Sequence, residues 1–329
     1  MWLLARIRLR TSHGIKVVGL VQGFRDTVTG EWLISDQDTS RLDSLNGQRP
    51  FGVQSVHPTG RYAALQVLVP HGESVVAVWE VATGKVVWVP KSAFAITWRR
   101  DGREVFAAGG SRSYHEGFLQ QHSWPDLQLI KGGRVEMEGY RIPNIAASPM
   151  DLVAMSSIDQ GETYVYVYNV EDAPNWPHLV ARWEDRSSNL INGLEFTPDS
   201  SALIWTLGCP YYWWVSEDEP GPSPGGRFSV GRIFRWKLTG GAPRDVSSTE
   251  VLVDVPAGWS AEDPEDILCS QMLLGPFFES PGSFRVLLPT GEWKTYNYDL
   301  HELSDRDIGK KAKVRDVATL DLQRTARTM

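Results

Sequence analysis

The chain has 329 residues, of which 42% are apolar and 22% charged, and its formal net charge is -7. This composition is typical of a soluble globular protein and not of a disordered one. The acidic balance argues against non-specific binding to nucleic acid or to an anionic membrane, since both require a basic surface. No window approaches the roughly 20 apolar residues of a membrane-spanning helix. The apolar run Met1–Ala5 is too short for a signal peptide, and the two cysteines, Cys209 and Cys269, provide no disulfide framework. We therefore expect a cytoplasmic protein.

The N-terminal region contains four strand-like runs, LLARIRLR, IKVVGLV, EWLISDQ and RLDSL, all within residues 1–51. Apolar and polar residues alternate from Leu4 to Arg10, which is typical of a strand with one face in water. Gly, Asp and Thr separate the runs, and Asn46-Gly47 follows them. This region therefore predicts one four-stranded sheet.

The next unit begins with SVHPTGRYAALQVLV, in which a short strand, a Pro58-Thr59-Gly60 turn and a second strand follow one another. Pro fixes φ and Gly supplies the positive φ of a tight turn, so this stretch predicts a hairpin. A second hairpin follows in VAVWEVATGKVVWV (Val76–Val89), around Ala82-Thr83-Gly84-Lys85. The whole unit is four antiparallel strands.

The same unit returns along the chain. Asp101-Gly102 lies 42 residues after Thr59-Gly60, Pro149 lies 49 after Arg100, and Pro198 lies another 49 on. Each of these turns is followed by a pair of strand-like runs. A period in the forties with four strands per repeat is typical of the blades of a β-propeller.

The C-terminal region keeps the pattern more loosely. Ile267–Leu300 contains strands and a Thr290-Gly291 turn, and VRDVATLDL (Val314–Leu322) predicts a fourth strand. The count is then six blades, or seven if the 78 residues from Pro198 to Pro276 hold a further one. No helical period of useful length occurs. The sequence thus predicts an all-β protein, with residues 1–329 forming a single propeller domain that has a long inserted loop at 208–229 and a charged connecting segment at 301–313.

The turns resemble those of the WD40-type β-propeller family. The matching pieces are HPTG, RRDG, SPMD and TPDS, together with VWEVATGKVVW, where Trp79-Glu80 stands in place of the family's usual Trp-Asp. The resemblance extends from about Phe51 to Val255. The family's Gly-His dipeptide and buried Asp are largely absent, which makes this chain a divergent member whose inter-blade polar network cannot be carried over. The resemblance implies a non-catalytic platform whose loops bind peptides or proteins.

No motif in the sequence predicts catalysis, a metal or a cofactor. GPSPG (Gly221–Gly225) matches the G-x-S-x-G nucleophile elbow, but that motif needs a backbone N–H after the serine, and Pro224 has none. His115-Glu116 with His122 lacks the spacing of helical zinc ligands. DQDTSR begins like a calcium loop but has Arg41 where glycine is required.

The segment CPYYWWVSEDEPGPSPGGRF (Cys209–Phe228) is the predicted partner-binding site. It makes a connection of about 20 residues where blade loops need about 2–5. Large aromatic side chains beside charges provide the apolar area and the hydrogen-bonding groups of an interface hot spot. The predicted binding residues are Tyr211, Tyr212, Trp213, Trp214, Glu217, Asp218 and Glu219. The alternative is that these aromatics extend a strand and pack into the blade. Trp176 and Trp259 are weaker candidates for partner binding.

We therefore predict a cytoplasmic scaffold that binds a protein or peptide partner, which is basic because these loops are acidic. One alternative is a propeller enzyme of the lactonase or glycoside-hydrolase type, with His, Asp or Glu around the central channel. Another is an accessory or sensor subunit of a larger complex.

Overall fold

The computed structural model describes residues 2–11, 14–25, 32–35, 42–68, 74–110, 116–138, 142, 144–159, 162–171, 175–186, 190–208, 226–239, 242–254, 273–280, 282–288 and 292–304. These residues form antiparallel strands joined by turns, and they contain no helix. The all-β prediction is therefore confirmed for the described part of the chain. No helix able to cross a membrane occurs in it either.

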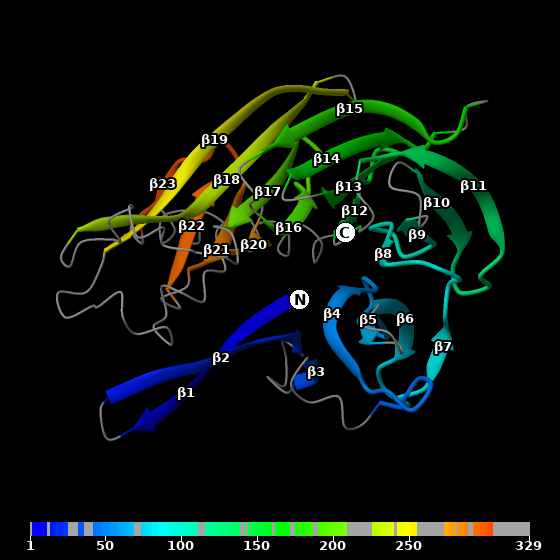
Figure 1. Cartoon of the computed structure of the whole chain (residues 1–329), viewed down its shortest axis with the longest axis horizontal. Coiled ribbons are helices and arrows are strands. Elements are labelled where there is room, and N and C mark those ends of the chain that lie inside the picture. The colour runs from blue at the N-terminus through cyan, green and yellow to red at the C-terminus, as the bar shows by residue number, and fades with distance from the viewer. Residues whose placement is uncertain are drawn as a thin grey trace, which may run out of the picture.

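The first sheet has three strands in the order β1-β2-β3. They are β1 (Trp2–Thr11), β2 (Gly14–Arg25) and β3 (Trp32–Ser35). The rest of the fold is five four-stranded sheets that follow one another in an arc, and the three-stranded sheet lies on the open side of this arc (Figure 1). Strand β2 contacts β4 of the first four-stranded sheet.

Each of the five four-stranded sheets is one propeller blade. Blade 1 consists of β4 (Pro50–Val56), β5 (Tyr62–Leu68), β6 (Ser74–Glu80) and β7 (Val86–Trp88). Blade 2 consists of β8 (Ala95–Trp98), β9 (Glu104–Gly110), β10 (Glu116–Ser123) and β11 (Leu129–Glu136). Blade 3 consists of β12 (Ile145–Ala147), β13 (Leu152–Asp159), β14 (Glu162–Asn169) and β15 (His178–Asp185).

The last two blades continue the same order. Blade 4 consists of β16 (Leu190–Phe196), β17 (Ala202–Gly208), β18 (Arg227–Thr239) and β19 (Ala242–Asp254). Blade 5 consists of β20 (Leu274–Ser280), β21 (Ser283–Leu287), β22 (Trp293–Asn297) and β23 (Glu302–Leu303). In every blade, strands that follow one another in sequence pair side by side, as the repeated hairpin pattern predicts.

The first turns of blades 1 to 4 share one backbone feature, despite their changing sequence. Their fourth residue has a positive φ: Gly60 (74°), Gly102 (73°), Asp151 (49°) and Ser200 (58°). In blade 5 the turn is shorter, because Ser280 pairs with Ser283, but Gly282 within it also has a positive φ (80°). A type I turn followed by a left-handed residue is a common three-residue hairpin loop. The sequence prediction of a turn at HPTG, RRDG, SPMD and TPDS is therefore confirmed, and Asp and Ser replace Gly in two of them at a conformational cost.

These turns also connect neighbouring blades. The first residue of one turn hydrogen-bonds to the fourth residue of the next: His57 Nε2 to the Gly102 carbonyl at 3.0 Å, and Ser148 Oγ to Ser200 Oγ at 3.5 Å. In the same relation, the Arg99 guanidinium donates to Asp151 Oδ1 at 2.7 Å. A polar inter-blade network therefore exists in this chain, built from residues other than those of the WD40 pattern.

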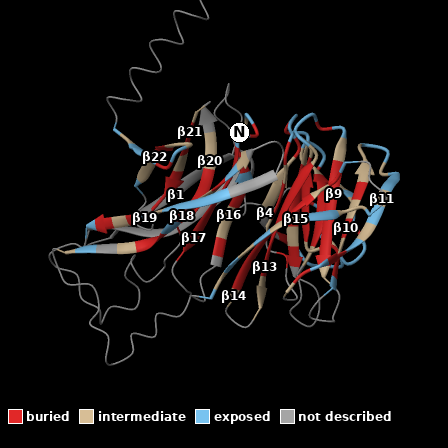
Figure 2. Ribbon diagram, turned by 90° about the horizontal axis from the view of Figure 1, so that it is seen from above, coloured by how far each residue is buried: buried red, intermediate tan, exposed pale blue. Residues whose placement is uncertain are grey.

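The core lies between blades, where middle strands pack face to face. Figure 2 shows the middle strands β13, β14 and β17 mostly buried, whereas β11 at the rim is mostly exposed. All seven residues of β17 are buried. Trp205 on this strand stacks on Phe234 of β18, with the ring centroids 5.3 Å apart. Burial on both faces accounts for the continuous apolar runs in these strands, in place of alternation.

The blade count differs from the expected six. The described residues form five four-stranded blades and one three-stranded sheet. The run RLDSL does not become the fourth strand of the first sheet, because Leu42 packs in the core of blade 1. The backbone of Asp43 is also used there, since its N–H donates to the Gly84 carbonyl at 2.7 Å and its carbonyl accepts from Trp79 Nε1 at 3.0 Å.

Two further expectations concern the C-terminal third. The interval from Pro198 to Pro276 holds β17, β18 and β19 of blade 4, and residues 255–272 within it lie outside the described residues. The fourth strand of blade 5 is β23, which pairs with β22. The segment Val314–Leu322, where the sequence places that strand, also lies outside the described residues.

Replacing Gly102 tests the contact between blades 1 and 2. A Cβ at this position would lie 2.7 Å from His57 Nε2, and φ there is +73°. We expect Gly102→Ala to lower the free energy of unfolding by roughly 1–2 kcal/mol, because alanine is strained in left-handed backbone. Loss of the His57 hydrogen bond should lower it by about 1 kcal/mol more. Urea unfolding monitored by Trp fluorescence measures this loss.

The control is Gly282→Ala in the first turn of blade 5, where φ is +80° and no atom lies within 4 Å of a built Cβ. This variant should lose only the stability that the left-handed backbone costs, so the difference between the two variants gives the contribution of the His57 contact. Equal losses in the two variants would show that the contact between the turns does not stabilise the ring.

Candidate binding site in the central channel

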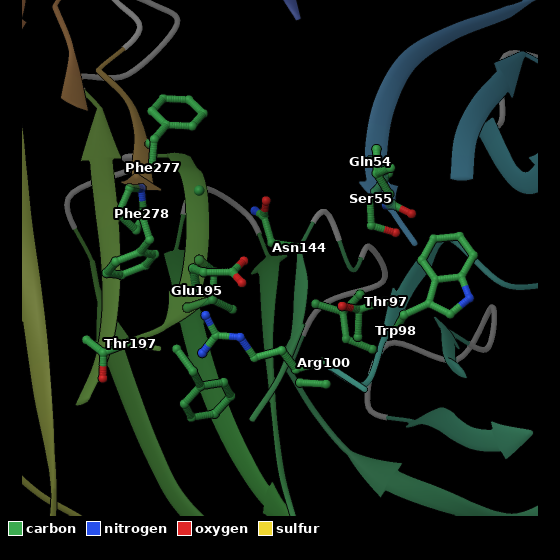
Figure 3. A pocket seen from close by; sticks show the side chains of 18 of the residues that line it. Gln54, Ser55, Thr97, Trp98, Arg100, Asn144, Glu195, Thr197, Phe277 and Phe278 are labelled. Carbon is green, nitrogen blue, oxygen red and sulfur yellow. The ribbon is translucent and has the colours of Figure 1, made fainter. Parts of the chain in front are cut away.

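The innermost strands of the five blades surround a channel with a cavity of about 510 Å³. Its wall combines apolar residues with amide and hydroxyl groups and with two charged side chains, Arg100 and Glu195 (Figure 3). Strands β4, β8, β12, β16 and β20 all contribute to it. A pocket of this volume at the axis of a propeller is the default location for a ligand site.

The Gln54 side chain ties blade 1 to blade 2 at the channel wall. Its Nε2 donates to the Phe94 carbonyl and its Oε1 accepts from the Ile96 N–H, both at 2.9 Å. Ser55 Oγ adds a bond to the Ile96 carbonyl at 2.6 Å. Because both ends of the Gln54 amide are hydrogen-bonded within the protein, this residue holds the channel wall together and is not a candidate ligand contact.

Asn144 plays the same part between blades 3 and 4. Its Nδ2 donates to the Ile191 carbonyl at 2.9 Å and to Ser156 Oγ at 3.1 Å. Blades 4 and 5 approach through backbone, since a Cβ at Gly193 would lie 1.9 Å from the Gly275 carbonyl oxygen. Thr206 Oγ1 donates to that same carbonyl at 2.6 Å. Glycine at position 193 is therefore required by the close approach of β16 and β20.

Arg100 reaches across the channel mouth from blade 2. It holds the second position of its turn, where Pro58, Pro149 and Pro198 stand in three other blades. One guanidinium N–H donates to the Pro198 carbonyl of blade 4 at 2.6 Å. The remaining N–H groups of this five-donor side chain are free to face the channel.

Glu195 projects into the channel from β16, between the buried Leu194 and Phe196. Figure 3 shows its carboxyl group near the Arg100 guanidinium. The carboxyl is accessible to water within the channel, but the surrounding protein restricts its hydration. This desolvation raises the pKa of Glu195 to about 7, although the Arg100 charge acts in the opposite direction. Among the described residues, Glu195 has no hydrogen-bond partner, and no ion pair joins it to Arg100 within 4 Å.

The sequence analysis did not single out Arg100 or Glu195. A signal was present for each: Arg100 replaces a turn proline, and Glu195 is an acid between two large apolar residues of a strand. Neither signal shows that the two side chains meet, because they come from blades that are not neighbours in sequence.

The predicted partner-binding residues lie outside the described residues: Tyr211, Tyr212, Trp213, Trp214, Glu217, Asp218 and Glu219. Trp259, Ser223, Cys209 and Cys269 lie outside them as well. Trp176 is described and is half-buried against the core that blades 2 and 3 share. Its Nε1 donates to the Val170 carbonyl at 3.2 Å, which gives this residue a structural role.

The enzyme hypothesis expects several carboxylates or histidines to converge at one channel mouth. Arg100 and Glu195 are the charged residues in the described channel wall. No group of three or more His, Cys, Asp or Glu arranged for a metal occurs in the part of the chain that the structure describes. What this wall offers a ligand is one pair of opposite charges.

Solved structures share the propeller fold with this chain. Kuenenia stuttgartiensis hydrazine synthase aligns with a TM-score of 0.55 and 11% identity, over 85% of this chain and 71% of that one. The Dos1 propeller aligns with a TM-score of 0.46 and 14% identity, over 84% and 62% of the two chains. A complex of KlAtg21 with the coiled-coil of AgAtg16 aligns at 0.45 and 14%, over 89% and 76%. At 11% identity, the likeness to hydrazine synthase shows the fold alone, and the two likenesses with TM-scores below 0.5 carry no argument.

No protein-family profile matches the sequence, and no curated protein matches it. The chain is thus a β-propeller by its structure, with blades that the sequence pattern predicts.

The Glu195 carboxyl is expected to titrate near pH 7, against about 4.5 for an unperturbed glutamate. Arg100→Gln removes the cation that lowers this pKa, so the midpoint should rise further. Carbon-13 NMR of the carboxyl measures both values. Because the folded protein keeps this proton to higher pH than the unfolded chain, ionisation destabilises the fold.

The wild type should therefore lose stability relative to Glu195→Gln as the pH rises from about 4.5 to about 7. A midpoint near 4.5 in the wild type, or a fall in the midpoint in Arg100→Gln, would contradict this account of the channel.

Proposed function

We propose that this protein is a divergent WD40-type propeller that binds a basic protein or peptide partner through residues 209–228. The observation that carries the proposal is the extension of blade 4 at the point where this segment joins it. The TPDS, HPTG and related turns support the family assignment, and their uniform geometry supports a stable platform.

The β18–β19 hairpin is longer than the blade that it completes. Both strands have 13 residues, whereas β17 has seven. Residues 202–208 of β17 pair with 231–237 of β18. Among the described residues, the start of β18, Arg227–Ser229, pairs only with β19. A two-stranded ribbon therefore extends past the blade and leads directly into the predicted segment.

The ribbon leaves blade 4 at the end opposite its first turn. Strand β17 runs away from that turn, so Gly208 and Pro198 lie at opposite ends of the blade. Loops held at one end of a stable scaffold are where binding residues concentrate. The aromatic residues of the segment supply apolar area and hydrogen-bonding edges for an interface.

The acidic residues indicate the charge of the partner. Glu217, Asp218 and Glu219 follow the aromatic run directly, and the whole chain has a net charge of -7. Complementary charge speeds association and fixes the orientation of a partner. A basic partner follows from this complementarity.

Trp213→Ala/Trp214→Ala tests the proposed site. Affinity capture with the full chain, from lysate of the cells that make it, should lose the bound partner by about tenfold or more, since truncated aromatic hot spots cost about 2 kcal/mol or more. Replacing the three acids by Gln, Asn and Gln should weaken capture most at low salt, because screening already weakens these charges at high salt.

The matched control is Leu129→Ala/Ile130→Ala, which removes exposed apolar side chains from β11 of another blade. It should leave capture unchanged. Capture that survives loss of both tryptophans, or that falls equally in the control, would sink the assignment of the site to residues 209–228.

A further inference from the structure

Above about pH 7, where the Glu195 carboxyl is ionised, the channel holds two opposite charges in one cavity. Glu195 comes from β16 and Arg100 from the first turn of blade 2, and Figure 3 shows both side chains within the same cavity. No ion pair within 4 Å joins them among the described residues. Opposite charges in a partly desolvated site attract strongly and are costly to leave without partners. The arrangement suits a ligand that inserts between them.

Two of the amide side chains in the wall are already engaged between blades. Both ends of the Gln54 amide and the Nδ2 of Asn144 are used between blades. Glu195 keeps acceptor oxygens without a partner among the described residues. Arg100 spends one N–H on the Pro198 carbonyl and retains others. A ligand therefore meets one strong acceptor and one strong donor, close together.

The rest of the wall sets the size and polarity of the ligand. The cavity of about 510 Å³ is within the range of about 300–1,000 Å³ for small-molecule sites. Phe277 and Phe278 of β20 line it on the side of blade 5 (Figure 3). The cavity therefore accommodates a ligand that carries an apolar group next to two opposite charges.

We propose that the channel binds a small zwitterion of the α-amino-acid class, whose ammonium donates to the Glu195 carboxylate and whose carboxylate accepts from Arg100. The site is at the turn end of the channel, away from where residues 209–228 join blade 4. The inference is therefore independent of the proposed partner, and each fails or succeeds alone.

The first experiment uses the full chain and probes that differ by one charge. Leucine carries both groups, 4-methylpentanoate lacks the ammonium, and 3-methylbutylamine lacks the carboxylate. Ligand-observed NMR should show leucine binding about tenfold or more tighter than either analogue, since a site built around polar partners rejects ligands that lack them. Leucine amide, which keeps a carbonyl, separates a free amino acid from the N-terminal residue of a peptide.

Variants then assign the two contacts. Glu195→Gln keeps the shape and should weaken leucine binding about tenfold or more, and Arg100→Met should do the same. Glu250→Gln is the matched control, because it removes an exposed carboxylate from β19 of the same blade. It should change nothing. Partner capture by Glu195→Gln should also stay unchanged, whereas Trp213→Ala/Trp214→Ala should retain leucine binding.

Three results would overturn the proposal. The first is equal affinity for leucine and either single-charge analogue. The second is an unchanged affinity in Glu195→Gln. The third is that no common amino acid, screened individually by thermal shift and NMR, binds the wild type with a Kd below about 10 mM. If Arg100→Met fails to fold because the Pro198 contact is lost, the wild-type analogue series and Glu195→Gln still decide.

Discussion

Blades 1 to 4 are joined by one repeated contact, in which the first residue of a blade's turn meets the fourth residue of the next turn. The chemistry changes from imidazole and carbonyl, to guanidinium and carboxylate, to two hydroxyls. The left-handed φ at the fourth position is what stays constant. The requirement is therefore one of backbone shape more than of side-chain identity, and these blades stay connected through different side chains.

The channel shows how one wall serves two purposes. Amide groups such as Gln54 and Asn144 hold neighbouring inner strands together and are consumed in doing so. Glu195 sits on the same ring of strands without such a partner. The carboxyl of Glu195 is open to the channel, but the surrounding wall restricts its hydration, and this desolvation raises its pKa. The polar groups that hold the wall together have hydrogen-bond partners, whereas the Glu195 carboxyl has none among the described residues.

The local devices of the fold could be predicted from sequence, because each is encoded within a few residues. HPTG, RRDG, SPMD and TPDS specify the turns, and the flanking β-branched runs specify the strands. The blade count could not be predicted, since RLDSL reads as a strand but its groups bond to blade 1. The channel charges were missed for a similar reason: Arg100 and Glu195 are 95 positions apart, and only the curved arrangement of the blades brings them into one cavity.

The outer strands differ in length, and this sets how each blade meets other chains at its rim. An unpaired edge strand offers N–H and C=O groups to which a foreign strand can add. In blades 1 and 5 the outer strands β7 and β23 have only three and two residues, too few to template another strand. In blade 3 the eight-residue β15 carries Arg182 and Glu184, paired at 3.2 Å, and such charges disfavour aggregation. The outer edges of blades 1 and 5 are thus protected from strand addition by their short length, and that of blade 3 by its charged side chains.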